Sequence, residues 1–274
     1  MNHEPFFTVT GLTAGYGGPD ILRGVEFSTA PGLVTGILGA NGSGKTTLLK
    51  AVCGLLPHGG QSLLEGCALG SLPPRQLARR CAYIPQRSGI GIDISVLDVV
   101  LMGYNPHLGL LERPTAQMKE TARRALALAG LAGREEENYQ TLSEGQKQLC
   151  ILARTLVSGA QLLLLDEPES ALDFQLRYRM LHLLRRWVRQ ERRAVLAALH
   201  DPMLALSCCD RLLILEEGKT LAVLSPARDP LPELETALSA IYGPVSLTAC
   251  TGRDGRRHLV MLSEEREEDE PWNP

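Results

Sequence analysis

Nine consecutive residues, Gly39 to Thr47, read GANGSGKTT and place glycines, a lysine and two threonines in one short segment. Glycine permits a tight turn whose backbone N–H groups point inward, and such a nest binds anions. An apolar run, LVTGIL, precedes the segment, and a helix-forming run, TTLLKAVCGLL, follows it. A loop that leads from a strand into a helix presents unpaired N–H groups and the positive end of the helix dipole. The pattern therefore predicts a phosphate-binding loop.

The residues of this loop have separate expected roles. Lys45 is placed to reach the β- and γ-phosphates of a nucleotide, and the Thr46 hydroxyl is placed to hold Mg²⁺. The nucleotide contacts expected within the loop are Gly39, Asn41, Gly42, Ser43, Gly44, Lys45, Thr46 and Thr47. A glycine-rich turn that matches the pattern by chance is the alternative, and the strand-loop-helix context argues against it.

A second group of reactive side chains follows four leucines, which run directly into Asp166 and Glu167. A strand of this kind is buried, and ligands of open parallel sheets bind at the carboxyl ends of the strands. Asp166 therefore suits Mg²⁺, directly or through water, and Glu167 is placed to polarise a water for attack on the γ-phosphate. Taken alone, LLLLDE fits a buried strand with a solvated acidic end equally well. The phosphate loop favours the catalytic interpretation.

Short apolar runs alternate with helix-length amphipathic segments, which predicts a largely parallel sheet flanked by helices and hence an α/β fold. The predicted strands are Thr8–Leu12, Leu33–Leu38, Cys81–Ile84, Leu162–Asp166, Ala194–Leu199 and Arg211–Glu216. Helices are expected after the second, fourth and fifth of these. The region from about Ser95 to Ala160 has helical periodicity and almost no β-branched run. We therefore expect a helical subdomain, at about residues 87–160, inserted into the α/β core.

Further motifs distinguish among the many proteins that share these two elements. Leu142 to Gln146 reads LSEGQ, precedes the helical run KQLCILARTL and lies directly upstream of the LLLLDEP strand. This order and spacing resemble the ABC ATPase family, whose signature is usually LSGGQ. The resemblance covers roughly Phe6 to Val223, with six motifs in register. It implies a P-loop NTPase (RecA-like) core with an antiparallel β portion and the inserted helical subdomain.

The resemblance also assigns site residues elsewhere. Tyr16 in LTAGYGG matches the aromatic residue that stacks on adenine, and a flat ring ahead of the phosphate-loop strand suits that contact. Gln86 in AYIPQ matches the glutamine that contacts Mg²⁺ or the attacking water. His200 in LAALHD matches the histidine that bonds the γ-phosphate and orients the water. Asp173 in SALD lies in the loop after the catalytic carboxylate and is counted with the nucleotide contacts. Taken singly, each of these residues fits an ordinary structural role.

Together these assignments imply ATP hydrolysis, with ATP and Mg²⁺ as cofactors. The expected catalytic residues are Glu167, His200, Gln86 and Lys45, and the expected metal contacts are Thr46, Gln86 and Asp166.

The signature motif implies that two chains act together. Ser143, Gly145 and Gln146 lie at the start of a predicted helix, in a lobe expected to be too far from its own phosphate loop to serve it. In the family they complete the nucleotide site of a second subunit, so a head-to-tail homodimer is expected. Glu144 departs from the family pattern because it stands where glycine is usual. A carboxylate that faced the phosphates would repel them, so we expect Glu144 to point away.

The stretch VLDVVLMGYNPHLG, Val96 to Gly109, resembles the ATPases of importers for iron chelates, haem and cobalamin, which often carry GR-x-PH. Gly103, Pro106 and His107 match this pattern, whereas Tyr104 stands where arginine is usual. We interpret His107 as a surface or packing residue because metal sites need clustered ligands. The resemblance implies polytopic membrane permease subunits and an extracytoplasmic substrate-binding protein as partners.

The expected organisation is an ATPase domain over residues 1–230, a small helix-strand extension over 231–263 and a disordered acidic tail over 264–274. Within the extension, Glu233–Tyr242 is predicted to form an amphipathic helix. VSLTAC and HLVML are predicted to form two strands across the turn GRDGRR.

Composition narrows the function classes. The chain of 274 residues is 44% hydrophobic and has a net charge of −3, so it can bury a substantial core and lacks the basic character expected of a nucleic-acid-binding protein. No apolar run approaches the roughly 20 residues needed to cross a bilayer, and the N-terminus lacks a secretory pattern. We expect a cytoplasmic protein, peripheral on the inner face of the cell membrane. The seven cysteines lack C-x-x-C spacing and indicate neither a disulfide framework nor a zinc site.

Other function classes fit less well. ABC ATPases of DNA repair or chromosome structure need a long coiled-coil insertion, and the segment between Gln86 and Ser143 is too short for one. Translation-associated ABC proteins usually have two ATPase halves in one chain. A soluble P-loop kinase leaves LSEGQ and His200 unexplained. An ABC ATPase of another transporter class, such as a zinc, manganese or molybdate importer or an exporter, is the main alternative.

Overall fold

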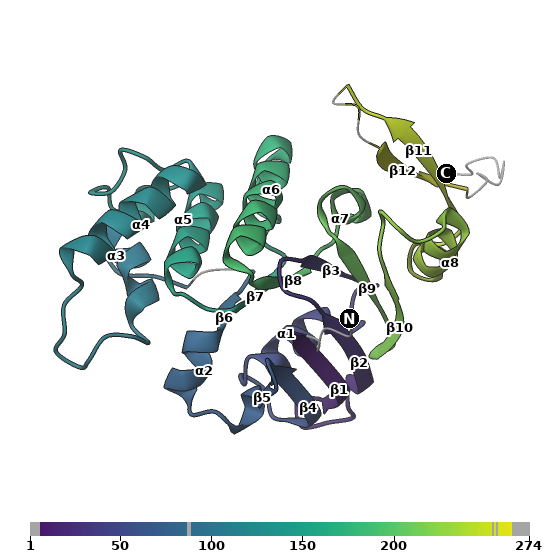
Figure 1. Cartoon of the computed structure of the whole chain (residues 1–274), viewed down its shortest axis with the longest axis horizontal. Coiled ribbons are helices and arrows are strands. Elements are labelled where there is room, and N and C mark those ends of the chain that lie inside the picture. The colour runs from purple at the N-terminus through teal and green to yellow at the C-terminus, as the bar shows by residue number, and fades with distance from the viewer. Residues whose placement is uncertain (1–5, 87–88, 254, 256, 265–274) are drawn as a thin grey trace, which may run out of the picture.

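The computed structural model describes residues 6–86, 89–253, 255 and 257–264 (Figure 1). Within them lie a six-stranded sheet of order β10-β9-β3-β8-β7-β6, a four-stranded sheet of order β2-β1-β4-β5 and the hairpin β11-β12. The strands are β1 Phe7–Ala14, β2 Leu22–Thr29, β3 Val34–Leu38, β4 His58–Leu64, β5 Cys67–Ala68, β6 Cys81–Ile84, β7 Leu162–Asp166, β8 Ala194–Ala198, β9 Arg211–Glu216, β10 Lys219–Leu224, β11 Val245–Thr251 and β12 Arg257–Ser263. The α-helices are α1 Lys45–Val52, α2 Pro74–Arg80, α3 Val96–Leu101, α4 Ala116–Ala129, α5 Glu144–Val157, α6 Phe174–Glu191, α7 Pro202–Cys208 and α8 Leu231–Tyr242. Short 3₁₀ turns span Leu69–Ser71, Met102–Tyr104 and Tyr139–Thr141.

The middle strands of the six-stranded sheet are parallel, and both of their faces are covered. Every residue of β3, β7 and β8 is buried, as expected for strands packed on both sides. Alternate side chains of β7 enter different cores. Leu162 and Leu164 pack with α1 and the four-stranded sheet, whereas Leu163 and Leu165 pack on the side of α6 and the helical lobe. Hydrophobic packing from two sides therefore fixes the strands whose ends carry the predicted site.

Helices α3, α4 and α5 form a separate layer beside α6 (Figure 1). The chain enters this layer after β6 and returns to the sheet at β7. Local signals set the ends of α4: the Thr115 hydroxyl accepts the Met118 N–H at the start, and Gly130 closes the helix in the left-handed conformation, with φ 84°. The helices α3–α5 thus form a lobe that joins the sheet only through β6 and β7 in the chain order.

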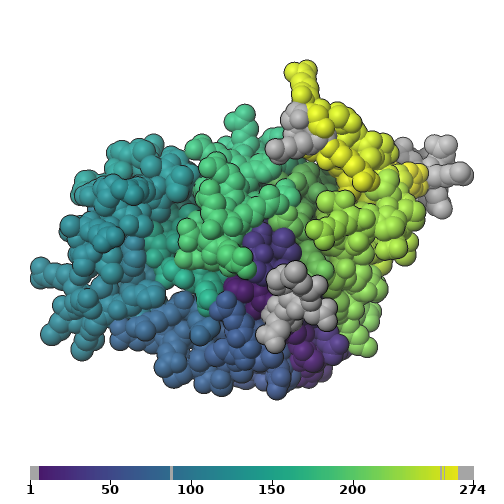
Figure 2. Space-filling view, in the orientation of Figure 1, coloured from purple at the N-terminus to yellow at the C-terminus, as the bar shows by residue number. Residues whose placement is uncertain are grey.

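The C-terminal elements pack onto the same core. Leu234 and Leu238 of α8 and Leu247 and Leu259 of the hairpin are buried in the cluster on the α6 side of the sheet. In Figure 2 the hairpin and the helical lobe lie toward opposite ends of the molecule. The predicted acidic tail falls almost entirely outside the described residues, which end at position 264.

The predicted α/β fold is confirmed. All six predicted strands are present to within two residues at each end, the three expected helices follow them, and the C-terminal helix and two strands form as predicted. The sequence interpretation did not include β2, β4, β5, β10 or α2. These strands belong to antiparallel segments with mixed polar and apolar residues, such as HGGQSLL in β4, so they lack a continuous apolar run. No helix in the described part of the chain is both long and apolar enough to span a membrane.

Candidate active site

Four neighbouring parallel strands end at one edge of the central sheet, and a predicted site residue stands at or just after the end of each. β3 leads to the phosphate loop, β7 ends at Asp166, β6 is followed by Gln86, and β8 is followed by His200. The pairings β3-β8, β8-β7 and β7-β6 are all parallel. Residues separated by more than a hundred positions are therefore brought to one place.

The phosphate loop requires its glycines. A Cβ on Gly39 would lie 2.4 Å from Ser43 Oγ, and Gly44 has a φ of 104°, in the region that favours glycine. Helix α1 begins directly at Lys45, so the unpaired N–H groups of its first turn lie at the loop. Ser43 Oγ is buried and has no hydrogen-bond partner among the described residues. Because a buried hydroxyl without a partner is costly, a phosphate oxygen fits this position.

Lys45 lies across the loop. Its Nζ donates to the carbonyl oxygens of Gly39, at 2.7 Å, and Ala40, at 3.1 Å, and the side chain is buried. Burial lowers the pKa of Lys45, and the nearby carboxylates of Glu167 and Asp166 oppose that shift. The ammonium thus lies at the loop within the electrostatic reach of both carboxylates, and a phosphate could exchange for its carbonyl contacts.

Asp166 joins the phosphate loop to the sheet. Its Oδ1 accepts the Thr46 hydroxyl at 2.8 Å, and its Oδ2 accepts the Tyr83 hydroxyl at 2.9 Å. One hydroxyl and one carboxylate are oxygen ligands that suit Mg²⁺. The described residues contain no group of three or more His, Cys, Asp or Glu side chains that could hold a metal ion. Mg²⁺ in proteins often takes one or two carboxylates and completes its coordination with waters and substrate phosphate oxygens.

The three predicted residues around the reacting water meet at one carboxylate. His200 Nε2 lies 2.5 Å from Glu167 Oε1, and Gln86 Nε2 donates to Glu167 Oε2 at 2.5 Å. Glu167 has a φ of 49°, an uncommon backbone conformation for a residue other than glycine. Gln86, predicted as a metal contact as well, here bonds the carboxylate.

Two residues of the site were missed by the sequence interpretation. Tyr83 lies within β6, opposite Leu164 of β7, and only the strand pairing reveals that its hydroxyl reaches Asp166. Glu169 is 3% exposed, its Oε1 accepts the His200 N–H at 2.9 Å, and its Oε2 has no partner among the described residues. Burial raises the pKa of Glu169, and the His200 N–H opposes the shift. Glu169 therefore holds the backbone of the histidine that touches Glu167.

Two substitutions of Glu169 should distinguish how its hydrogen bond and its charge each affect the free energy of unfolding. Glu169→Ala leaves the His200 N–H without its partner and should lower the free energy of unfolding by about 1–3 kcal/mol. Glu169→Gln keeps an acceptor and removes a buried charge, so at neutral pH it should be at least as stable as the unmutated chain. A raised carboxyl pKa means that stability falls as pH rises through it, so the advantage of glutamine should vanish in acid. Denaturant unfolding at several pH values measures this. Equal losses for both variants at neutral pH would contradict it.

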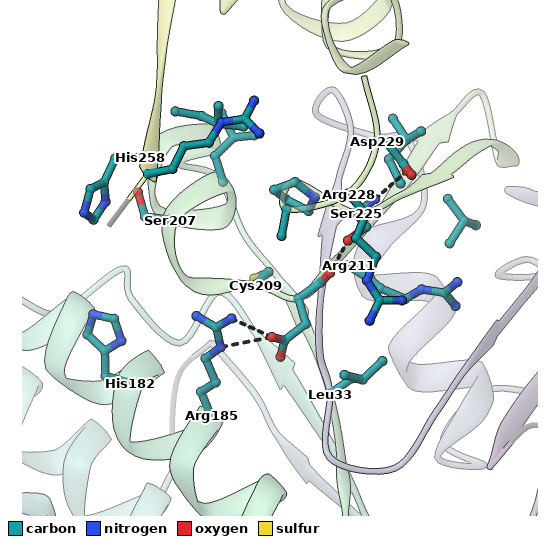
Figure 3. A pocket seen from close by; sticks show the side chains of 18 of the residues that line it. Leu33, His182, Arg185, Ser207, Cys209, Arg211, Ser225, Arg228, Asp229 and His258 are labelled. Carbon is teal, nitrogen blue, oxygen red and sulfur yellow. Dashed lines mark hydrogen bonds and ion pairs between the residues drawn. The ribbon is translucent and has the colours of Figure 1, made fainter. Parts of the chain in front are cut away.

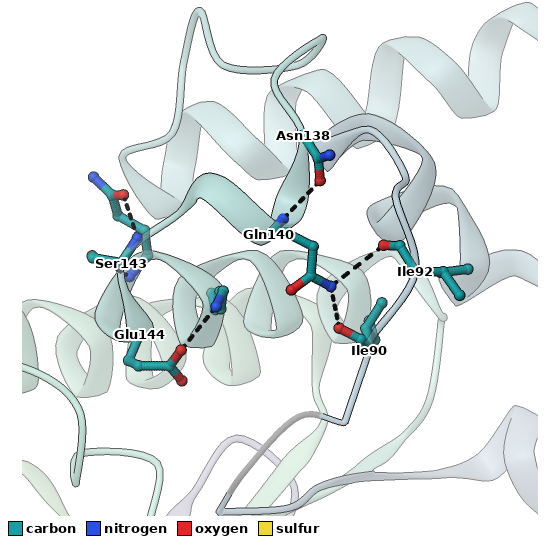
Figure 4. Close-up of polar contacts among 8 residues, drawn as sticks. Ile90, Ile92, Asn138, Gln140, Ser143 and Glu144 are labelled. Carbon is teal, nitrogen blue, oxygen red and sulfur yellow. Dashed lines mark hydrogen bonds and ion pairs between the residues drawn. The ribbon is translucent and has the colours of Figure 1, made fainter.

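The signature motif forms the start of α5. The Ser143 hydroxyl accepts the Gln146 N–H at 3.3 Å, and Gln146 Oε1 accepts the Ser143 N–H at 3.0 Å, which makes a capping box. The Glu144 carboxylate lies along its own helix and accepts from Lys147 Nζ at 2.8 Å (Figure 4). A Cβ on Gly145 would lie 3.0 Å from the carbonyl oxygen of Ala171, so glycine permits the close approach of α5 to the loop after β7.

The signature forms its polar contacts away from Gly39–Thr47. Among the described residues no hydrogen bond or ion pair joins Ser143, Gly145 or Gln146 to Gly39–Thr47. Gln140 Nε2 instead donates to the carbonyl oxygen of Ile90, which ties the start of the signature to the segment after Gln86 (Figure 4). These contacts connect the lobe to the Gln86 side of the site.

The remaining predicted residues lie at the margin of the site. Tyr16 is 57% exposed, and Lys50 Nζ lies 5.9 Å from the centroid of its ring. Asp173 caps α6 through an Oδ1 that accepts the Leu176 N–H at 2.9 Å. Asn41 and Gly42 are exposed, and Thr47 is buried in α1. His107 Nε2 lies 2.7 Å from the carbonyl oxygen of Ser158, which gives this residue a packing role.

A family model described as ABC transporter matches residues 22–170, more than half of the chain. The chain belongs to the ABC transporter family. This ABC ATPase is 38% identical over 241 residues to the hemin import ATP-binding protein HmuV of Pseudomonas entomophila, covering 86% of this chain and 91% of that protein. The cobalamin import ATP-binding protein BtuD of Halobacterium salinarum is 38% identical over 214 residues, or 77% of this chain and 53% of that protein.

The fold comparison agrees. The ABC ATPase chain matches a chain of a metal-chelate type ABC transporter in an inward-facing conformation with a TM-score of 0.79. Sequence identity is 24%, and the match covers 95% of this chain and 99% of the other. The predicted P-loop NTPase fold is thus confirmed. ATP is the nucleotide that this family binds.

Proposed function

We propose that this ABC ATPase energises the import of an iron chelate, haem or cobalamin. The observation that carries the proposal is its 38–39% identity, over most of its length, to ATP-binding proteins named for hemin import. The match to a cobalamin import protein supports the same substrate class of large, metal-containing chelates. The stretch around Gly103, Pro106 and His107, read from the sequence as typical of such importers, is consistent with it.

The site residues take complementary roles in this proposal. Thr46, Asp166 and Gln86 would hold Mg²⁺, which neutralises charge on the β- and γ-phosphates when bound. Lys45 binds the same phosphates as a buried point charge. Glu167 orients the attacking water and accepts a proton from it as a general base. His200 lies close enough to the Glu167 carboxylate to hold that water in line.

A dimer completes the site. Ser143 and Gly145 stand at the start of α5 and make no hydrogen bond or ion pair with the phosphate loop of their own chain within the described residues. A second copy arranged head to tail would bring them to its partner's nucleotide. Glu144, held by Lys147, would then have its charge partly compensated and directed along its own helix.

A surface of the helical lobe suits a membrane permease. Leu110 and Leu111 follow α3 and are almost fully exposed, at 101% and 94%. The preceding loop is tied down, because Arg79 Nε donates to the carbonyl oxygen of Pro106 at 2.8 Å and His107 is held by Ser158. Two neighbouring leucines on a fixed loop offer an apolar contact for a partner protein. We assign this surface to permease subunits, which would place the ATPase at the inner face of the membrane.

Uptake measurements test the import proposal. Cells that carry the permease and lack this chain should fail to accumulate one of haemin, a ferric chelate or cobalamin, and the unmutated chain should restore uptake. Glu167→Gln should not restore it, whereas Arg123→Ala, on an exposed position of α4, should. Leu110→Asp with Leu111→Asp should abolish uptake while the purified chain keeps its ATPase activity. Efflux, rather than uptake, that depends on the chain would favour the exporter alternative.

A further inference from the structure

A cavity of about 900 Å³ lies at the edge of the central sheet opposite the phosphate loop (Figure 3). Leu33 and Arg211 place it at the amino ends of β3 and β9, whereas the phosphate loop follows the carboxyl end of β3. Its other walls come from α6, α7, the connection between β10 and α8, and β12. The C-terminal extension therefore closes a space against the ATPase core, and this space is separate from the nucleotide site.

The lining is strongly cationic. Five arginines line the cavity, Arg185, Arg189, Arg211, Arg228 and Arg257, against two aspartates, Asp210 and Asp229. Three positive charges are thus in excess, although the whole chain carries a net charge of −3. A concave surface of one sign concentrates the field and attracts ligands of opposite charge.

Part of this charge is committed within the protein. Arg185 and Arg189 share one oxygen of Asp210, at 2.7 and 2.8 Å, while Asp210 Oδ2 accepts the Val34 N–H at 3.0 Å. Asp210 has only 10% of its side chain exposed, so it is fixed between α6 and the start of β3. Each guanidinium has five N–H donors, so Arg185 and Arg189 carry more donors than the bonds to Asp210 use.

Arg211 is also committed, because its Nη1 donates to the carbonyl oxygen of Ser28 at 2.9 Å, but the side chains of two further arginines are not. The side chains of Arg228, in the connection after β10, and Arg257, at the first position of β12, form no hydrogen bond or ion pair with any of the described residues. Asp229, next to Arg228, already accepts the Ser225 N–H at 2.7 Å. Guanidinium groups present paired donors that match the two oxygens of a phosphate or carboxylate. Arg228 and Arg257 thus add free anion-binding groups to the Arg185–Arg189 pair.

We propose that this cavity binds a small anion that carries two or more phosphate or carboxylate groups. Its volume lies within the range of small-molecule sites, about 300–1,000 Å³. Arg185 and Arg189 come from α6, Arg228 from the β10–α8 connection and Arg257 from β12, so one anion bound among these four would join the C-terminal extension to the core. The inference does not depend on the transported substrate or on the nucleotide site.

Calorimetric titration tests the proposal with two probes, inorganic pyrophosphate and citrate, which distinguish phosphate from carboxylate ligands. All chains carry Lys45→Ala, to weaken anion binding at the nucleotide site. Arg228→Ala with Arg257→Ala should weaken binding of at least one probe by about tenfold or more, because charge-assisted hydrogen bonds are lost. The matched control, Arg113→Ala with Arg123→Ala, removes the same charge from exposed positions of the helical lobe and should leave affinity unchanged.

Three results would overturn the proposal. The first is no binding of either probe by the chain with all five arginines. The second is equal weakening in the two double variants, which would indicate a general effect of charge. The third uses a truncated chain that ends at Glu264. If the truncated chain binds the probes and the full chain does not, the acidic residues after position 264 compete for the arginines. A free anion is then not the ligand. Thermal unfolding of each variant without probe checks that it is folded.

Discussion

Glu167→Gln is expected to keep ATP binding and to lower the hydrolysis rate by a factor on the order of 10² or more. The Glu167 carboxylate has His200 Nε2 at 2.5 Å on one oxygen and Gln86 Nε2 at 2.5 Å on the other, so it is the point at which the site converges. Glutamine preserves the size of the side chain but cannot draw a proton from water. The phosphate loop, Lys45 and Thr46 are unchanged, so the affinity for ATP should remain.

Phosphate release and ATP binding should be measured on the same preparations. Glu120→Gln is the matched control, because it makes the same change on the exposed surface of α4, where Glu120 forms an ion pair with Arg124. The control should hydrolyse ATP at the unmutated rate. Near-normal turnover by Glu167→Gln would show that another group activates the water, and weakened ATP binding would show that the carboxylate has a role in the ground state.

The central sheet could be predicted because burial on both faces requires continuous apolar runs. The run LLLLD in β7 is of this kind. Because the strand belongs to a parallel sheet, its last residue, Asp166, lies at the edge where the neighbouring parallel strands also end. The phosphate loop was predictable for a similar reason, since its glycines, lysine and threonine are needed within one turn of chain. Burial of a strand and the shape of a phosphate loop both constrain residues that are adjacent in the sequence.

Contacts between distant segments could not be predicted in this way. The position of Glu169 after Pro168 resembles any acidic loop residue, yet folding buries it beneath the backbone of His200. Tyr83 reaches Asp166 only through the register of β6 on β7. The cationic cavity likewise combines arginines from α6 and from the C-terminal extension, which have no spacing in common. Only the three-dimensional arrangement reveals these groups.

The expected role of the signature motif, Leu142 to Gln146, depends on a contact between two chains, which the structure of one chain does not contain. Ser143 caps α5 and makes no hydrogen bond to Gly39–Thr47 of its own chain within the described residues. If it serves a nucleotide, it does so in a second subunit. A mixture of two defective chains can test this, one with Ser143→Arg and the other with Lys45→Ala. Both also carry Glu167→Gln, which blocks turnover and leaves ATP-dependent association as the readout.

A head-to-tail heterodimer of these chains has one site with both defects and one with intact Lys45 and intact Ser143. That second site exists only if Ser143 acts in trans, so the mixture should associate with ATP and Mg²⁺ better than either variant alone at low micromolar protein. Light scattering measures the association, with the Glu167→Gln chain as the positive control. Because Ser143→Arg also removes a helix cap worth about 1 kcal/mol, its thermal unfolding must first show that it is folded. A mixture that associates no better than its components would mean that the arrangement is wrong or that both sites must be intact together. A monomeric enzyme would show no ATP-dependent association in any combination, including the positive control.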